Sequence, residues 1–214
     1  MRFRDRGEAG DVLADRLQKA GLDSQNTVVI GIPRGGIILA DIVAGRLGAA
    51  FDIVIPRKLS APGSEELAIG AVMADGTSYV NDYVVDALKI SAEYIESEKA
   101  KQAAEISRRM ALYRRKELGY DISGRDVVLV DDGAATGSTM TAAARWIAKQ
   151  SPKSLTVAVP VAPKATVEML ALEADSVIVA ATPRDFSSVG QFYDEFDQIT
   201  DEQVIQIAKS RKLV

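Results

Sequence analysis

A run of four apolar residues that ends in two aspartates constrains the fold of this chain more than any other feature. Val127–Val130 are β-formers with no alternating polar position, as in a strand that helices cover on both faces of a parallel sheet. Asp131 and Asp132 follow, and a loop of small and hydroxyl residues leads into an apolar helical pattern over 138–150. A strand, loop and helix in this order direct free backbone N–H groups and the positive end of a helix dipole at one point. The sequence therefore predicts a site that binds a phosphate group.

The composition of this loop narrows the ligand. It contains no lysine, unlike the loops that bind triphosphates, and the chain has no G-x-G-x-x-G turn after a strand. The loop carries hydroxyls at Thr136, Ser138 and Thr139, and Gly137 allows a close backbone approach. Both carboxylates can serve one ligand because the apolar run ends at Asp131. The pattern indicates a sugar phosphate, with ribose 5-phosphate as the obvious candidate, and the alternative is a buried strand whose aspartates only cap a turn.

This stretch resembles the donor-binding signature of type I phosphoribosyltransferases, and most closely their stand-alone predicted members. These enzymes use 5-phosphoribosyl 1-diphosphate (PRPP). The resemblance implies an α/β fold in which helices flank a parallel sheet and a small hood or arm is added. It also implies that Asp131 and Asp132 bind the ribose hydroxyls and act in catalysis, while the loop wraps the 5-phosphate. The loop residues that this assigns to PRPP are Gly133, Ala134, Ala135, Thr136, Gly137, Ser138 and Thr139.

A second motif lies upstream, where the apolar strand 27–32 is followed by Pro33, Arg34, Gly35 and Gly36. It resembles the family's diphosphate-binding loop, which often carries a cis non-proline peptide bond. Glycines let backbone N–H groups face oxygen atoms, and a guanidinium suits a diphosphate. We therefore expect PRPP to contact this loop and Arg34 to take part in catalysis. A tight turn between strand and helix is the alternative.

A third motif is the basic pair Arg57 and Lys58, which follows an expected strand over 51–56 and precedes a Pro/Gly/Ser-rich loop. In the family, a mobile loop begins near this position and closes over the diphosphate. The resemblance implies that both cations neutralise the leaving group during catalysis. A solvated strand end is the alternative.

Composition excludes several classes of mechanism. The 214 residues include 47% hydrophobic residues, which suits a single domain over 1–214. A net charge of −4 makes nucleic-acid binding unfavourable. We expect a cytoplasmic protein without membrane contact, since the apolar runs are short and the first residues do not form a signal peptide. The chain has no cysteine and no histidine, so thiolate nucleophiles and imidazole bases are excluded.

The periodicity of the chain predicts alternating strands and helices, hence a right-handed parallel sheet. The expected elements are a helix from Asp11 to near Gly21, strand 27–32, helix 36–47, strand 51–56, strand 126–131, helix 138–150, strand 154–161, helix 163–173, strand 176–181 and a last helix capped by Thr200 and Gln203. Residues 59–125 interrupt this order with a hairpin turning at Asp75-Gly76 and a helix over 91–118. That helix could be a hood, an arm over the site or a dimer contact. Its basic residues around 108–116 fit a solvated face, with diphosphate or RNA contact as alternatives.

The segment 182–214 is expected to form a C-terminal hood. It loosely resembles the base-side loop of purine-type members, which implies contacts from Asp185, Phe186, Phe192 and Tyr193; core packing is the alternative. The resemblance implies a Mg²⁺ cofactor held through the diphosphate and ribose of the donor, with Asp131, Asp132 and Asp185 as candidate protein ligands. Ala135 stands where hypoxanthine-guanine members carry an acid, and residues 194–197 are acidic where an arginine often follows.

Two hypotheses follow from these motifs. The first is a Mg²⁺-dependent phosphoribosyltransferase that moves ribose 5-phosphate from PRPP to a nitrogenous base, in nucleobase salvage. The second is a non-catalytic PRPP-binding regulator that could act through RNA. The expected partners are PRPP and a nucleobase-like acceptor, with a homodimer as an option, and the sequence leaves the acceptor open.

Overall fold

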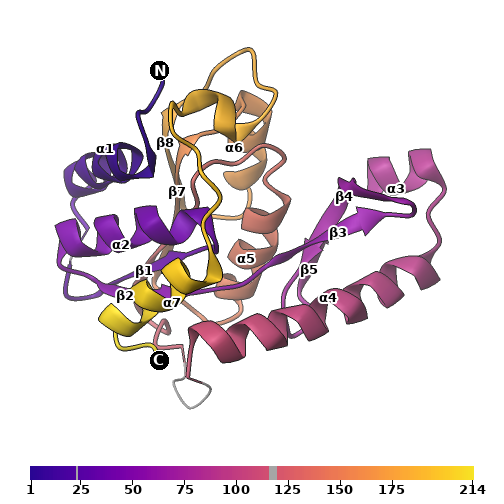
Figure 1. Ribbon diagram of the computed structural model, residues 1–214, viewed down its shortest axis with the longest axis horizontal. Helices are drawn as coiled ribbons and strands as arrows, with labels where there is room; N and C mark the ends of the chain where they lie inside the picture. The colour runs from indigo at the N-terminus through magenta and orange to yellow at the C-terminus, as the bar shows by residue number, and fades with distance from the viewer. Residues whose placement is uncertain (23, 116–119) are drawn as a thin grey trace.

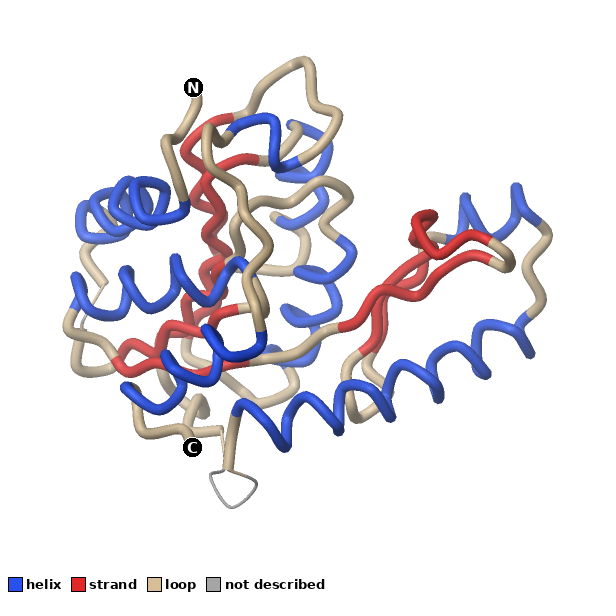
Figure 2. Tube along the Cα trace, in the orientation of Figure 1, coloured by secondary structure: helices blue, strands red, loops and turns tan. Residues whose placement is uncertain are grey.

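The computed structural model describes residues 1–22, 24–115 and 120–214, and its centre is an all-parallel sheet. The strand order is β2-β1-β6-β7-β8, which confirms the expected parallel α/β architecture (Figures 1 and 2). The strands are β1 (Thr27–Gly31), β2 (Ala50–Ile53), β6 (Asp126–Val130), β7 (Ser154–Val161) and β8 (Ser176–Ala181).

Helices cover both faces of this sheet. One core cluster joins it to α1 (Arg6–Lys19), α2 (Gly35–Leu47) and α7 (Asp201–Ser210). The other joins it to α5 (Ser138–Ala148) and α6 (Lys164–Leu170). None of the helices in the described ranges combines the length and apolar character that a membrane span requires.

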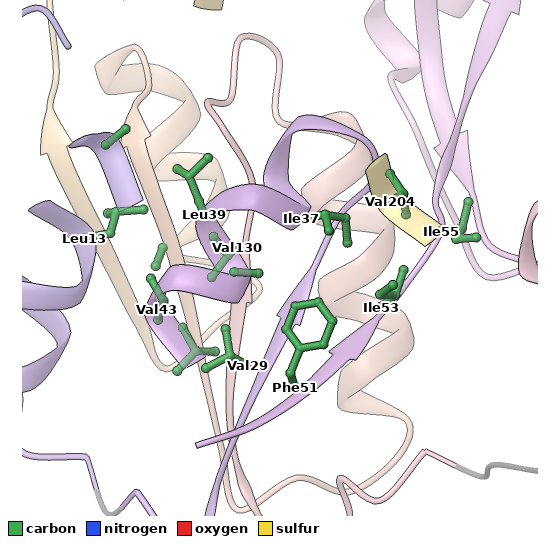
Figure 3. Packing of buried hydrophobic residues seen from close by; sticks show 14 of the residues in the cluster. Leu13, Val29, Ile37, Leu39, Val43, Phe51, Ile53, Ile55, Val130 and Val204 are labelled. Atoms are coloured by element: carbon green, nitrogen blue, oxygen red, sulfur yellow. The ribbon is translucent and has the colours of Figure 1, made fainter. Parts of the chain in front are cut away.

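The apolar runs of the central strands follow from this layering. Val29 and Val130 belong to the cluster on the α2 side, and Figure 3 shows Val130 near Leu39 and Val29 near Val43 of that helix. Val28 and Leu129, their neighbours in sequence, belong to the cluster on the α5 side. Because successive side chains of a strand point to opposite faces, a strand covered on both sides has no polar position.

An arm extends from one end of the sheet, as Figure 2 shows. It contains the antiparallel sheet β3-β4-β5 and two helices. Its elements are β3 (Arg57–Ala61), β4 (Ser64–Val72), β5 (Ser78–Val80), α3 (Asp82–Leu88) and α4 (Ala92–Tyr113). The expected hairpin is present, because β4 pairs with β5 and Gly76 in the turn has a φ of +85°. At its root the arm packs against α5 and α7.

The strand expected over 51–56 ends earlier than predicted. β2 stops at Ile53, and residues from Arg57 onward form β3, not a loop. The reason is long-range pairing, since Arg57 lies opposite Val72 and Lys58 lies opposite Ala71 in β4. Local sequence marks the turn residues here but does not reveal that partner strand.

The expected helix over 91–118 is also too long. α4 ends at Tyr113, and Arg114 is extended, with φ −152° and ψ 136°. The guanidinium of Arg114 binds both carboxylate oxygens of Asp52 in β2, at 2.7 and 2.9 Å. A bidentate pair of this kind fixes the direction in which the chain leaves the helix. The rest of the expected helix, from 116 onward, lies outside the described residues.

Three further differences are local. α1 begins at Arg6 and not near residue 11, because the side chain of Asp5 accepts the backbone N–H of Glu8. The short helices α3 and η1 (Val189–Phe192) were not expected. The last helix, in contrast, begins after Thr200 as expected, with the predicted capping box to Gln203.

Candidate functional site

The loops that carry the predicted motifs meet at the carboxyl edge of the sheet. β1 lies between β2 and β6, so the chain leaving each of these three strands emerges at one place. The backbone N–H of Ile32 donates to the carbonyl of Val130 (3.0 Å), and that of Val54 donates to the carbonyl of Gly31 (3.1 Å). These hydrogen bonds keep the three exits in register and bring residues 32–36, 54–58 and 131–137 together.

The loop after β1 packs directly against the acidic pair. A Cβ atom on Gly35 would overlap the carboxylate of Asp132, and one on Gly36 would lie 2.7 Å from the Cα of Asp131. Both glycines are therefore required by a close approach between two loops. The Pro33–Arg34 peptide bond is cis, as the resemblance implies.

The acidic pair is mostly withdrawn from solvent. The side chain of Asp132 is 15% exposed and forms an ion pair with Arg6, whose Nε lies 2.8 Å from Oδ2. The backbone N–H of Asp132 donates to Oδ1 of Asp131 (2.8 Å). Burial and then the neighbouring charge of Asp132 raise the pKa of Asp131, while the charge of Lys58 opposes the rise. Burial also raises the pKa of Asp132, against the charge of Arg6. Two carboxylates thus share a poorly solvated space with one fixed cation, which favours a ligand that brings hydroxyl donors or positive charge.

The loop after β6 is fixed from behind. Thr166 donates its hydroxyl to the carbonyl of Ala135 (2.6 Å), and the N–H of Ala134 donates to the carbonyl of Val161 (3.0 Å). Gly137 has a φ of +71°, a left-handed conformation that glycine adopts without strain. The loop is therefore anchored to α6 and to the end of β7.

The front of this loop presents hydrogen-bonding groups. Ala135 and Thr136 are exposed, and the hydroxyls of Thr136 and Ser138 lie 3.1 Å apart. Among the described residues, no side chain caps the N-terminus of α5 at Gly137 or that of α2 at Arg34. The first N–H groups of an uncapped helix and its dipole favour an anion. Both helices begin at the shared edge, so the edge can bind two anionic groups.

The predicted basic residues are divided between different surroundings. Lys58 is exposed, and its charge acts on Asp131. Arg57 turns to the arm, where its Nε donates to Oε1 of Gln102 in α4 (3.0 Å). Burial, and then the charge of Arg109, lower the pKa of Arg57. Arg34 forms an ion pair with Asp201 of α7, with Nη1 3.6 Å from Oδ1.

A cavity of about 850 Å³ separates the sheet edge from the arm. Pro33 and Thr139 contribute to it from the two loops, and Arg57 and Lys58 contribute from β3. The far wall comes from the arm and includes Ser60, Ser64, Tyr94, Glu98, Lys101 and Gln102. The arm thus faces the predicted loops across a polar space.

The predicted base-side residues are less accessible. Phe192 and Tyr193 are buried at 8% and 2% exposure, and the Tyr193 hydroxyl donates to the carbonyl of Asp132 (2.7 Å). Phe186 is half-buried and packs on Phe192, with ring centroids 5.1 Å apart, while Asp185 is exposed. In the structure, Tyr193 supports the acidic pair from within the core.

Several residues at the site were missed by sequence reasoning. Arg6 is the main one, and Gln102 and Glu98 in the cavity wall are others. Arg6 and Asp132 are 126 positions apart, so local periodicity carries no signal for their contact. Arginines stand at positions 2, 4 and 6, and nothing in their spacing distinguishes Arg6 from the other two.

The donor set suits a Mg²⁺ ion that arrives with a phosphorylated ligand. Within the described residues there is no cluster of three or more acidic side chains that could hold a metal ion. Asp131 and Asp132 are adjacent, and one oxygen of Asp132 is engaged by Arg6. Mg²⁺ typically keeps water and is bound by one or two carboxylates together with substrate phosphates, and the residues present fit that mode.

Comparison with known proteins places this geometry in context. The model of the phosphoribosyl transferase domain matches residues 7–184. Two Mycobacterium tuberculosis proteins, from strains CDC 1551 and H37Rv and named as candidate phosphoribosyl transferases, are each 40% identical over 203 residues, or 95% of this chain. The chain spans about half the length of these curated relatives, covering 45% of each. The crystal structure of TT1426 from Thermus thermophilus is 43% identical and covers 98% of this chain and 99% of its own, with a TM-score of 0.81.

Proposed function

This chain belongs to the phosphoribosyl transferase domain family, and from that premise we propose that it transfers ribose 5-phosphate from PRPP to a nitrogenous base. The reaction is Mg²⁺-dependent, and its biological setting is nucleobase salvage in the cytoplasm. The observation that carries the proposal is the meeting, at one sheet edge, of two poorly solvated carboxylates and two helix N-termini that no side chain of the described residues caps.

The edge offers one kind of group to each part of the donor. The 5-phosphate binds the N–H groups and hydroxyls of the loop from Gly133 to Thr139. The ribose hydroxyls donate to Asp131 and Asp132, and the diphosphate binds the loop from Pro33 to Gly36. Hydroxyl donors satisfy carboxylates that are poorly solvated in the free protein.

The leaving group is handled by charge. Arg34 in the β1 loop and Lys58 in β3 offset negative charge as the bond to the diphosphate lengthens. Lys58 and Arg57 both border the cavity between the sheet edge and the arm. When bound, Mg²⁺ supplies further positive charge to the diphosphate. Because the chain has no histidine, the chemistry depends on this charge placement and not on an imidazole base.

The acceptor is a nucleobase-like heterocycle in this proposal. Asp185 and Phe186 are the more accessible of the four base-side residues, since Phe192 and Tyr193 lie in the core. Ala135 is exposed where hypoxanthine-guanine members carry an acid, which favours acceptors that do not need that group.

A regulator acting through RNA has less support. Arg108 and Arg109 both bind Glu105, and Arg114 is buried against Asp52. Within the described residues, the basic side chains at the end of α4 and just after it are therefore partly neutralised and do not form one continuous basic surface.

The proposal is tested by incubating the purified protein with PRPP, Mg²⁺ and a panel of purine and pyrimidine bases, and separating the nucleotides formed. We expect at least one base to yield its nucleotide with an equal amount of diphosphate. Asp132→Asn should reduce turnover or donor affinity at least tenfold. The exposed Asp121→Asn should behave as wild type. Donor binding without product from any base would contradict the enzymatic part of the proposal and favour the regulator.

A further inference from the structure

Residues 3–4, near the N-terminus, pair with residues 192–195, the segment that precedes α7, beside the acidic pair. The N–H of Phe3 donates to the carbonyl of Phe192, and the N–H of Asp194 donates back to the carbonyl of Phe3, both at 2.8 Å. The N–H of Glu195 donates to the carbonyl of Arg4, also at 2.8 Å. This pairing places the first residue of α1, Arg6, over the C-terminal segment.

Arg6 is held on three sides. Its Nε donates to Oδ2 of Asp132 at 2.8 Å, and its Nη1 donates to the carbonyl of Asp197 at 2.7 Å. The guanidinium carbon lies 3.9 Å from the centroid of the Phe196 ring. The Arg6 side chain is only 10% exposed. A cation that is buried, stacked and doubly hydrogen-bonded has one orientation.

Arg6 and Tyr193 together restrain Asp132. Oδ2 of Asp132 lies between Arg6 and the backbone of Gly35, and the Tyr193 hydroxyl binds the Asp132 carbonyl at 2.7 Å. We call Arg6, Tyr193, Phe196 and Asp197 the terminal clasp. All four lie outside residues 7–184, the part of the chain that matches the family domain.

We propose that Arg6 is a positioning residue for the donor: it holds the Asp132 carboxylate in the orientation in which the acidic pair receives the ribose hydroxyls. The physical need is visible in the site, because two adjacent carboxylates in a poorly solvated space repel each other. The positive charge of Arg6 offsets the negative charge of Asp132, and its hydrogen bond fixes the orientation of the Asp132 carboxylate. The inference rests on the proposed function, because it names the ribose of PRPP as the group that Asp132 meets.

A structural role for Arg6 makes a different prediction. If Arg6 only attached the N-terminal segment to the fold, its loss would lower stability and weaken every ligand alike. A positioning role affects the ribose-bearing donor and largely spares inorganic diphosphate, because diphosphate carries no ribose hydroxyl to donate to Asp132. It also requires the effect of Arg6 to disappear once Asp132 is neutral.

The experiment is a double-mutant cycle read by calorimetry with Mg²⁺, using PRPP and inorganic diphosphate as separate ligands. The variants are Arg6→Met, Asp132→Asn and the pair. Arg4→Met is the matched control, since Arg4 is exposed and its side-chain ion pair within the described residues is with the adjacent Asp5. We expect Arg6→Met to weaken PRPP binding at least tenfold and to change diphosphate binding less than twofold. In the Asp132→Asn background, Arg6→Met should change PRPP affinity less than twofold.

Arg6→Lys is a second, milder variant that keeps the test informative if Arg6→Met does not fold. Lysine keeps the positive charge but lacks the planar guanidinium that donates to Asp132 and Asp197 together. It should weaken PRPP by about threefold, again only while Asp132 is present. Wild-type affinity in both Arg6 variants, or an equal loss in the presence and absence of Asp132, would overturn the positioning role while leaving the proposed function intact. A wild-type protein that binds diphosphate but not PRPP would overturn the proposed function and this inference together.

Discussion

The two loops at the sheet edge start alike and are built differently. Each follows a buried parallel strand and opens a helix that, within the described chain, has no side-chain cap. The loop at 32–36 is closed in front, where Gly35 and Gly36 touch the acidic pair. The loop at 133–137 is fastened behind, through Thr166 and Val161, and is open in front.

The difference shows that glycine is required for different structural reasons in the two loops. Packing against Asp131 and Asp132 determines Gly35 and Gly36, so the β1 loop also supports the carboxylates. A left-handed backbone angle and close packing against Thr166 and Met169 determine Gly137, whereas Thr136 beside it is exposed. The first loop should therefore tolerate less change than the second.

The largest effect is expected from Gly35→Ala. The added methyl group would overlap the Asp132 carboxylate and crowd Arg6, so both the loop and the acidic pair must shift. We expect a loss of about 1–3 kcal/mol in the free energy of unfolding, typical of overpacking, and at least a hundredfold loss of PRPP affinity. Urea unfolding and calorimetry measure the two effects.

Gly45→Ala is the matched control for this variant. Gly45 lies in the same helix, α2, and its Cβ would meet only the end of the Arg211 side chain, at 3.3 Å. Alanine is favoured over glycine in a helix interior by about 0.5–1 kcal/mol. The Arg211 guanidinium, which donates to the Asp41 carbonyl, must shift slightly to make room, so we expect only a small net change in the free energy of unfolding. If Gly35→Ala behaved like Gly45→Ala, the β1 loop could not be packed against the carboxylates as described.

Gly137→Ala should have a smaller effect. Its φ of +71° disfavours alanine by about 1–2 kcal/mol, and the methyl group would press on Thr166 and on the flexible end of Met169. We expect about a tenfold loss of PRPP affinity from displaced N–H groups at the start of α5. A loss as large as that of Gly35→Ala, measured under the same conditions, would remove the contrast between the loops.

Asp131→Asn should separate stability from binding. Burial and the charge of Asp132 raise the pKa of Asp131, so its ionised form opposes folding. The stabilising contribution of the protonated form is complete below the ordinary pKa of an aspartate and is lost as the pH rises through the raised value. Asparagine resembles the protonated form at every pH.

We therefore expect Asp131→Asn to melt about 2–4 °C above wild type at pH 7, the shift that roughly 1 kcal/mol produces in a chain of this size, while PRPP binding is lost. The advantage should shrink as the pH is lowered. Thermal melts over a series of pH values give the answer, and a lower melting temperature at pH 7 would show that the ionised carboxylate is stabilising in the free protein.

The smallest effect is expected far from the loops, at Glu105 on the arm. Arg108 and Arg109 lower the pKa of Glu105 to about 2. The contribution of the ionised Glu105 carboxylate to the free energy of unfolding is complete above the ordinary pKa of a glutamate and is lost as the pH falls through about 2. Because the group is accessible to solvent, Glu105→Gln should cost about 0.5 kcal/mol at pH 7 and leave PRPP affinity unchanged. A tenfold loss of affinity would mean that this helix face belongs to the site.

Local pattern was sufficient for the parts of the molecule whose causes are local. The apolar runs at 27–32 and 127–130 predicted central strands, and the residues after them predicted the two loops and their helices. The turn at Asp75-Gly76 and the cap at Thr200 were likewise readable from adjacent residues.

Contacts between distant residues were not predictable. The pairing of β3 with β4, the Arg114–Asp52 ion pair and the Arg6–Asp132 ion pair join positions that share no periodicity. The aromatic segment around Phe192 could equally stack on a ligand or fill the core, because aromatic side chains do both. Only the fold shows that Tyr193 lies beneath the acidic pair.

The central claim is that the sheet edge binds the activated pentose through its acidic pair and its open loop. Titration of PRPP into the purified protein by isothermal calorimetry, with Mg²⁺ present, tests it most directly. We predict saturable binding of one PRPP per chain, weakened at least tenfold by Asp132→Asn and unchanged by Asp121→Asn. Absence of binding to the wild-type protein, or equal affinity in wild type and Asp132→Asn, would contradict the account.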